Sequence, residues 1–368
     1  MDLKGLILSQ HDRNDSSAYT HRLRKLARCL DERGMRTSFL YMEDTPPLHK
    51  ITTASLFLPF FWRTLRSNDF FHCGDSDAGQ AMFLGRFFRR GPVMLDVHGD
   101  VIAQSSLANE IRSKGTHTAP SPRVRLSYSL AKASADHFLV VSTFQKDLLI
   151  REGVAADRIS LVRNGVDLEL FPQLPMAQWD GFKFGYAGGF QTWQGIDLLL
   201  DAFERVPNPA VRLLVAGFQK SDAPLKGRFE ARFGPRVELV DRTDQGNLAR
   251  ILGTCSMLVI PRKDHPAIRH AFPTKFAEFA ALGRPVLVND VDETAEFVKR
   301  HNCGFTASPT PESMADAMTR AAALPPEALG DMGERARKMA ERNFAWQVIG
   351  DHYAEVVREA VARFGRGR

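Results

Sequence analysis

The segment His270–Asn289 contains the residues with the clearest chemical potential in this sequence. Pro273 and Thr274 precede an apolar pattern with helical spacing, and both residue types are favoured where a helix begins. The free amides at a helix N-terminus form a natural site for an anion such as phosphate. Glu278 is a lone acid on this predicted helix, which a buried strand over 285–288 follows. The segment predicts a phosphate-binding loop and helix, although Glu278 could also be an ordinary solvated side chain.

His98 is a second candidate, because it follows the apolar run Val93–Val97 and precedes a glycine. Ligands of open α/β sheets bind beyond the carboxyl ends of the strands, which is where this histidine is expected to lie. A lone histidine is more often structural, so both interpretations stay open. Asp100, two residues further on, is a candidate for contact with an acceptor.

The elements that position these residues come in two series. Strands alternate with helices over residues 1–172, and again over 177–344. Such alternation predicts two mostly parallel, doubly wound sheets with helices on both faces. Prolines interrupt the pattern at 171–175, which we predict to be the hinge. The strands are expected near 5–8, 37–41, 70–72, 93–97, 138–141, 183–187, 212–216, 237–240, 257–260 and 285–288.

Three stretches resemble the family-four glycosyltransferases, which are retaining enzymes of GT-B fold that use nucleotide sugars. They are 140–167, which includes an Asn-Gly-Val-Asp turn, 186–203, and 270–289. The Asn-Gly pair could alternatively be an ordinary tight turn. The resemblance implies two Rossmann-like domains that face each other across a cleft. It also implies that the last helix, about 345–368, crosses back to the first domain.

The resemblance carries specific expectations for the donor site. Glu278 falls on the second acid of the family's acidic pair, which hydrogen-bonds the ribose of the donor, whereas the first acid is replaced by His270. The two family cations that hold the diphosphate fall on Gly189 and Gln194. His98 resembles the strand-end histidine that lies at the donor sugar and the reacting centre.

The missing cations require a replacement, because a diphosphate that leaves bulk water needs compensating charge. Lys275 stands at the predicted helix start, and Arg262, Lys263 and Arg269 lie on the loop before it. We predict that Lys275 and at least one of the two arginines replace the absent pair, although each could be a solvated surface cation. Phe272 completes the expected donor-binding residues.

The loop after the first strand is polar and contains Ser16 and Ser17 but no glycine. The corresponding family loop is usually glycine-rich and approaches the donor phosphate or the acceptor. We expect the amides of these two serines to lie on the acceptor side.

Composition limits the function classes. The chain has 368 residues, more than one core usually serves, with 44% hydrophobic and 25% charged residues, as in ordinary globular proteins. Four separated cysteines, without a C-x-x-C pair, argue against a zinc site or a disulfide framework. The net charge of +6 suits anionic partners, but no nucleic-acid-binding motif accompanies it. Without an apolar leader or span, the chain is expected in the cytoplasm.

Two stretches of the first domain, 53–66 and 81–90, combine bulky aromatics with arginines. Such composition is typical of segments that lie at the inner face of a membrane, with aromatics in the interface and cations toward anionic headgroups. The alternative is that they are helices packed against the sheet.

These observations predict a metal-independent glycosyltransferase that needs no cofactor besides its co-substrate, a nucleoside-diphosphate sugar. The acceptor would be a glycan, a lipid-linked saccharide or a small molecule, in the synthesis of a cell-surface polysaccharide, a glycolipid or a related glycan. No nucleic-acid partner is expected. A catalytically inactive binding or regulatory relative is the alternative, because three family positions have changed together. A sugar-nucleotide epimerase of the same fold is a third hypothesis.

Overall fold

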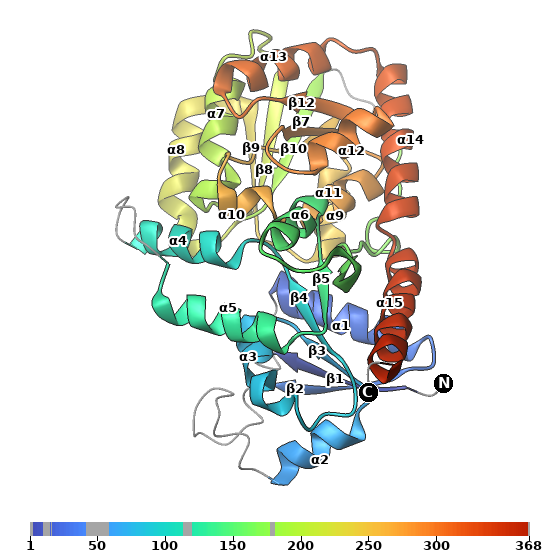
Figure 1. Ribbon diagram of the computed structural model, residues 1–368. Coiled ribbons are helices and arrows are strands. Elements are labelled where there is room, and N and C mark those ends of the chain that lie inside the picture. The colour runs from blue at the N-terminus through green and yellow to red at the C-terminus, as the bar shows by residue number, and fades with distance from the viewer. Residues whose placement is uncertain are drawn as a thin grey trace. The chain divides into compact units, whose positions relative to one another are not determined.

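The structure is a computed structural model that describes residues 3–9, 15, 17–41, 59–112, 120–176 and 181–366. The chain forms two compact units (Figure 1). The first comprises residues 1–164, 270–272 and 346–368, and the second comprises 165–269 and 273–345. The chain thus leaves the first unit after Asn164, before the proline-containing stretch 171–175. That stretch belongs to the second unit because Arg284 donates to the carbonyl oxygen of Leu174 at 2.8 Å and Arg337 donates to that of Phe171 at 3.0 Å.

The first unit contains a six-stranded parallel sheet of order β2-β1-β3-β4-β5-β6. The apolar runs expected to be strands do form it, because a parallel strand covered on both faces must be hydrophobic on both. Its strands are β1 (Lys4–Ser9), β2 (Arg36–Tyr41), β3 (Phe70–Cys73), β4 (Val93–Val97), β5 (His137–Val140) and β6 (Ile159–Leu161). Its helices are α1 (Ala18–Asp31), α2 (Pro59–Ser67), α3 (Ser76–Gly85), α4 (Val101–Arg112), α5 (Pro122–Ser134), α6 (Thr143–Arg151) and α15 (Trp346–Arg366).

Two separate cores cover the two faces of this sheet. Successive residues of a strand point to opposite sides. Phe70 and Met94 therefore pack with residues of α1 and α15, whereas Phe71 and Leu95 pack with residues of α3 and α5. The expected return of the last helix to the first unit is confirmed, since α15 buries Tyr353 and neighbouring apolar residues against α1 and the sheet.

The second unit repeats the design with a parallel sheet of order β12-β11-β10-β7-β8-β9. The sequence pattern did not predict β12, which is short and only partly buried. Its strands are β7 (Phe182–Ala187), β8 (Val211–Phe218), β9 (Val237–Asp241), β10 (Met257–Ile260), β11 (Val286–Asn289) and β12 (Gly304–Ala307). Its helices are α7 (Ile196–Glu204), α8 (Ala223–Phe233), α9 (Gln245–Leu252), α10 (Pro266–Arg269), α11 (Thr274–Ala281), α12 (Thr294–His301), α13 (Pro311–Ala322) and α14 (Pro326–Asn343).

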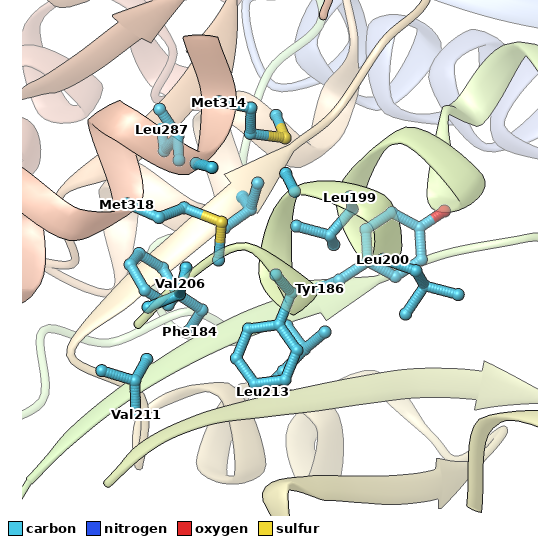
Figure 2. Close-up of a cluster of buried hydrophobic side chains, with 14 of the residues drawn as sticks. Phe184, Tyr186, Leu199, Leu200, Val206, Val211, Leu213, Leu287, Met314 and Met318 are labelled. Carbon is cyan, nitrogen blue, oxygen red and sulfur yellow. The ribbon is translucent and has the colours of Figure 1, made fainter. Parts of the chain in front are cut away.

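One face of the second sheet packs against α7 and α13 (Figure 2). Phe184 and Tyr186 of β7 contribute large rings to this core, and Leu199 of α7 and Met318 of α13 cover them. Each of these four side chains is at most 1% exposed. The core fixes the carboxyl end of β7 and therefore the loop that follows it.

Gly195, between β7 and α7, is required by geometry. Its φ angle is +68°, and a Cβ atom there would lie 1.5 Å from the carbonyl oxygen of Pro261. We expect Gly195→Ala to lower the free energy of unfolding by about 3 kcal/mol, because left-handed strain adds to a backbone collision. Urea unfolding would measure this. The control is Gly227→Ala, which meets no atom within 4 Å in α8 and should be neutral or slightly stabilising. Equal behaviour of the two variants would contradict the prediction.

The four cysteines are buried and unpaired by disulfides. Within the described ranges, no group of three His, Cys, Asp or Glu side chains is arranged to hold a metal ion. None of the described helices combines the length and the apolarity that crossing a bilayer would require.

Candidate active site

Helix α11 begins at Thr274, with Pro273 as the preceding cap residue. Threonine can satisfy a free amide at a helix start, but among the described residues no side chain, that of Thr274 included, caps this terminus. The helix carries Lys275 in its first turn and Glu278 one turn later, and both are partly buried. A helix N-terminus without a side-chain cap keeps its amides available to an anion, and its dipole favours negative charge there.

The ammonium group of Lys275 lies against the loop that follows β7. Its Nζ donates to Oε1 of Gln194 at 3.3 Å and lies 5.1 Å from the centre of the Tyr186 ring. Gly188 makes room for it, because a Cβ atom on Gly188 would lie 1.8 Å from this Nζ. The structure thus brings Lys275 together with the glutamine that occupies a cation position of the resembling family.

Burial shifts the pKa values of both Lys275 and Glu278 toward neutral pH, and the attraction between their opposite charges opposes both shifts. Burial lowers the pKa of Lys275 to about 8, and the nearby charge of Arg262 adds to the effect, while Glu278 opposes it. Burial raises the pKa of Glu278 to about 7, and Lys275 opposes that shift. Both groups therefore titrate near neutral pH, which is common at functional sites.

The other cations expected to help are partnered with acids. Arg262 is buried and forms an ion pair with Asp292, whose other carboxylate oxygen accepts from the amide and hydroxyl of Thr294. Lys263 forms an ion pair with the exposed Asp197 in the first turn of α7 at 2.5 Å, and Arg269 forms one with the exposed Asp264 of the same loop at 2.8 Å. Of the cations in this loop, Arg262 is the one whose charge acts on Lys275.

Gly189 lies one residue beyond Gly188 in the same loop. Its carbonyl oxygen accepts from the hydroxyl of Tyr186 at 2.6 Å. This bond fixes the backbone where the resembling family carries an arginine, and Gly189 itself offers only backbone groups there.

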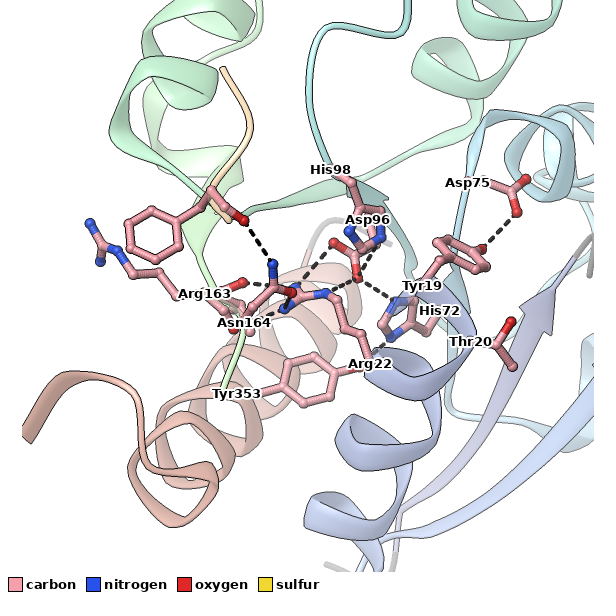
Figure 3. Close-up of polar contacts among 12 residues, drawn as sticks. Tyr19, Thr20, Arg22, His72, Asp75, Asp96, His98, Arg163, Asn164 and Tyr353 are labelled. Carbon is pink, nitrogen blue, oxygen red and sulfur yellow. Dashed lines mark hydrogen bonds and ion pairs between the residues drawn. The ribbon is translucent and has the colours of Figure 1, made fainter. Parts of the chain in front are cut away.

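In the first unit, Asp96, the penultimate residue of β4, forms an ion pair with Arg22 (Figure 3). Arg22 of α1 donates to both carboxylate oxygens of Asp96, at 3.0 and 3.2 Å. Its remaining hydrogens go to the carbonyl oxygens of Val162 and Arg163 and to Oδ1 of Asn164. Burial alone would raise the pKa of Asp96, but the Arg22 guanidinium, with the neighbouring imidazoles, holds it well below its usual range.

His72 extends this network toward the last helix. His72 and Asp96 share the sheet face of Phe70 and Met94, the face that α1 and α15 cover. Nε2 of His72 lies 3.3 Å from Asp96, and its Nδ1 lies 2.6 Å from the hydroxyl of Tyr353 on α15. Figure 3 shows these side chains converging from three elements.

His98 lies at the outer end of the same network. Its Nε2 is 3.5 Å from Oδ2 of Asp96, and its ring meets the edge of Tyr19, whose hydroxyl donates to Asp75 at 2.7 Å. Burial lowers the pKa of His98 to about 4, and the Arg22 charge adds to this, so the imidazole is neutral at pH 7. The His98 side chain remains 25% exposed, so a ligand can reach it.

His270 also belongs to the first unit by its contacts. Its carbonyl oxygen accepts from the hydroxyl of Ser142 at 2.6 Å, and its Nδ1 lies 3.8 Å from Oδ2 of Asp100. The other oxygen of Asp100 accepts from the amide of Ala103 and caps α4. Asp100 therefore has a structural task at this helix, and its predicted contact with the acceptor stays a prediction.

Two further predicted residues have structural partners. Ser17 caps α1, since its hydroxyl accepts from the amide of Thr20, while its own amide donates to Asp15 at 3.0 Å. The carbonyl oxygen of Phe272 accepts from Nδ2 of Asn164 at 3.2 Å, and the ring is buried. Ser16 lies outside the described residues, so its predicted role is not assessed.

Sequence reasoning missed the residues that surround His98. In the sequence, Arg22 is one of several basic residues of a predicted helix, and Asp96 is the single acid inside the predicted strand Val93–Val97. A signal was present, because an acid in the middle of an apolar run that must be buried requires a cation or several donors.

The fold defines the class of protein. Two Rossmann-like units, with a terminal helix returned to the first, form the GT-B architecture. A sucrose-phosphate synthase from Thermosynechococcus elongatus shares it with a TM-score of 0.76 and 20% identity, over 98% of this chain and 100% of that one. The HepE protein of Anabaena, in complex with UDP and glucose, shares it with a TM-score of 0.71 and 16% identity, over 97% and 100%.

Family models then match most of both units. The glycosyltransferase family 4 model matches residues 20–170, and the model described as glycosyl transferases group 1 matches 181–323. The chain belongs to this glycosyltransferase family.

Two curated relatives match parts of the chain. TuaH of Bacillus subtilis, provisionally named a teichuronic acid biosynthesis glycosyltransferase, is 21% identical over 67% of this chain. The gpi3 subunit of the Schizosaccharomyces pombe phosphatidylinositol N-acetylglucosaminyltransferase is 26% identical over 51%. The matches span 59% and 41% of the length of these two relatives.

Proposed function

We propose that this protein transfers a sugar from a nucleoside-diphosphate sugar to a hydroxyl group of an acceptor. The observation that carries the proposal is Lys275, whose ammonium group lies in the uncapped first turn of α11 and bonds to Gln194. A helix N-terminus and a partly buried cation together supply the positive field that a departing diphosphate requires. The charge that the family draws from the loop after β7 comes here from the helix that faces this loop.

The residue roles follow from this placement. Glu278 hydrogen-bonds the ribose hydroxyls, and Lys275 with the amides after Pro273 binds the diphosphate. Gly189 and Gln194 line this seat from the other side, and Arg262 adds positive potential although Asp292 already neutralises part of its charge.

His98 contacts the donor sugar in this proposal. A neutral imidazole has one ring N–H and one acceptor nitrogen. Asp96, 3.5 Å from Nε2, favours the tautomer that carries its proton on this nitrogen. Asp96 is therefore a positioning residue that acts through His98. His270 is proposed to lie near the same sugar.

The reaction breaks the bond between the anomeric carbon and a diphosphate oxygen and forms a bond from that carbon to the acceptor oxygen. The acceptor proton leaves with the phosphate, and the configuration at the anomeric carbon is retained. The bond electrons go to the diphosphate, which Lys275 and the helix N-terminus stabilise. This scheme uses no metal ion and no cofactor besides the co-substrate.

The relatives suggest which ligands to test first. HepE was solved with UDP and glucose, and TuaH is named for synthesis of a cell-surface polymer. These names support a uridine-linked hexose as the first donor and a glycan or a lipid-linked saccharide as the first acceptor.

Donor affinity should depend on pH through Lys275. Its pKa of about 8 lies below the ordinary value of 10.5, so the ammonium group loses its proton just above physiological pH. Each further pH unit removes about nine-tenths of the protonated form, so affinity should fall roughly tenfold per unit above pH 8. Calorimetric titration would measure this fall. In Lys275→Arg the guanidinium stays charged, and the fall should disappear; an identical profile in both proteins would contradict the role.

The proposed function is tested by donor screening followed by product analysis. A nucleotide sugar that binds the folded chain raises its unfolding temperature by mass action, which permits a screen of UDP, GDP, ADP and their sugars. The donor found is then incubated with candidate acceptors. Transfer or slow donor hydrolysis supports the proposal. Interconversion of sugar nucleotides would indicate an epimerase, and no binding or turnover would indicate a non-catalytic relative.

A further inference from the structure

A cavity of about 590 Å³ lies in the first unit, away from the residues discussed above. Ser134–His137 at the start of β5 form one wall, Arg158 before β6 forms another, and Arg363 with Phe364 near the end of α15 closes it. Arg86 and neighbouring residues after α3 complete the lining. Four segments far apart in the sequence therefore build one pocket.

The cavity and His98 lie at opposite ends of the strands of this sheet. Strands β4, β5 and β6 are parallel, and the cavity residues precede β5 and β6 whereas His98 follows β4. Because ligands of such sheets bind at the carboxyl ends, this pocket at the amino ends is separate from the candidate active site.

The lining of the cavity is positively charged. Four arginines contribute, with two acids to oppose them, and His137 adds no charge at neutral pH because burial lowers its pKa to about 4. Asp136 pairs with Arg89, and Asp157 pairs with Arg363 at 3.0 Å. The four arginines are Arg86, Arg89, Arg158 and Arg363.

Arg89 is the most informative of these arginines. It is 5% exposed, donates to the carbonyl oxygen of Gly91 at 2.6 Å and to Asp136 at 2.9 Å, and stacks on the ring of Phe364. Its Nε hydrogen, however, has no acceptor among the described residues. A buried guanidinium with an unmet donor beside a cavity favours an anionic occupant.

The rim of the cavity is aromatic and exposed. Phe87 is 64% exposed and Phe88 is 47% exposed, and the guanidinium of Arg86 lies over the Phe87 ring at 4.7 Å. Phe88 does not line the cavity itself but follows Phe87 in the chain, and Trp62 of α2 packs edge-on against it with the ring centres 4.2 Å apart. No acid occurs in the stretch 81–90, which ends with two exposed aromatic rings and two arginines. Exposed rings beside arginines are typical of a surface that lies in a membrane interface.

We propose that this face of the first unit docks on an anionic phospholipid surface, with the cavity taking a headgroup phosphate. Arg86 and Arg363 contact the phosphate from the mouth of the pocket, Arg89 supplies charge from below, and Phe87 and Phe88 enter the interfacial region. The positive charge of the pocket complements anionic headgroups. The exposed aromatic rings beside it can insert at the boundary between the headgroups and the acyl chains. This docking is independent of the transfer reaction, because it uses the amino ends of the strands, whereas His98 lies at the carboxyl ends.

Co-sedimentation with vesicles tests the proposal, using the full chain without donor. We expect binding to phosphatidylcholine vesicles that contain phosphatidylglycerol, little binding to phosphatidylcholine alone, and weaker binding at high salt. The double variant Arg86→Gln, Arg363→Gln should reduce partitioning roughly thirty-fold, as the loss of two arginines near an anionic surface implies. Phe87→Ser with Phe88→Ser should reduce it while keeping the charge. The control, Arg228→Gln with Arg250→Gln, removes the same charge from exposed positions of the second unit.

Circular dichroism and unaltered unfolding midpoints confirm that the variants fold. Equal partitioning of the parent and the Arg86, Arg363 variant would overturn the proposal. So would an equal loss in the control, since that would indicate attraction by net charge alone. Binding of inorganic phosphate without any vesicle binding would show a site for a free anion and also overturn it. None of these results bears on donor turnover, which is measured separately.

Discussion

Replacing Lys275 with alanine should lower kcat/KM for the nucleotide sugar by about two orders of magnitude, the usual effect of removing one group that stabilises developing charge. Its ammonium group bonds to Gln194 and occupies the space that Gly188 leaves open. Once the lysine is removed, the positive charge that still acts on this position is that of Arg262, which is already paired with Asp292. Steady-state kinetics with the donor found by screening would measure the loss.

The matched control is Lys299→Ala on α12, an exposed lysine paired with Asp290 at 2.6 Å. It removes the same charge from the same unit and should change kcat/KM by less than about twofold, since exposed pairs contribute little. Calorimetry with the nucleoside diphosphate should show the Lys275 loss already in binding. If Lys275→Ala bound and turned over the donor as the parent does, the proposed diphosphate seat would be wrong.

Replacing Asp96 with alanine should lower the free energy of unfolding by about 3–5 kcal/mol, the range for breaking a buried ion pair. The substitution leaves the guanidinium of Arg22 buried without its carboxylate, although three other acceptors remain. It also removes the group that lies near His72 and His98. Urea unfolding, followed by circular dichroism, would measure the change in the transition of the first unit.

Asp351→Ala provides the control for this measurement. Asp351 pairs with Arg33 at 2.8 Å but its side chain is 73% exposed, so its loss should cost less than about 1 kcal/mol. The cost of Asp96→Ala should also be smaller in an Arg22→Met background, because the two charges are coupled. Similar losses for Asp96 and Asp351, or additive effects of Arg22 and Asp96, would contradict the interpretation.

Asp96→Asn separates positioning from stability. The amide keeps the shape of the carboxylate but removes the charge that favours a proton on Nε2 of His98. We therefore expect the asparagine variant to lower kcat more than it weakens donor binding, provided that it folds. The pair of substitutions at this one position distinguishes a structural acid from one that also positions His98, the histidine proposed to contact the donor sugar.

Much of the fold follows from the sequence, because most of the strands that form it are short and largely apolar runs. Val93–Val97 and Met257–Ile260 have the bounds that their hydrophobicity predicts, since a strand buried on both faces cannot be polar. β12 and the three-residue β6 were not among the strands that the apolar runs predict, because both are short and partly exposed. The positions of His98 after a strand and of Glu278 on a helix are likewise local properties of the chain.

The partners of these residues are not local, and only the tertiary structure shows them. Lys275 meets Gln194, 81 positions away, and Arg22 meets Asp96, 74 positions away. Side-chain type predicts that a buried acid or a diphosphate needs a cation, but it does not say which of 49 lysines and arginines provides it. Arg262 illustrates the difference, because its position suggested a phosphate ligand and the fold pairs it with Asp292. Hydrophobic periodicity, and the burial that it implies, can be recognised in the local sequence. Charge pairing depends on distances in space, and the packing of the sheets and helices determines these distances.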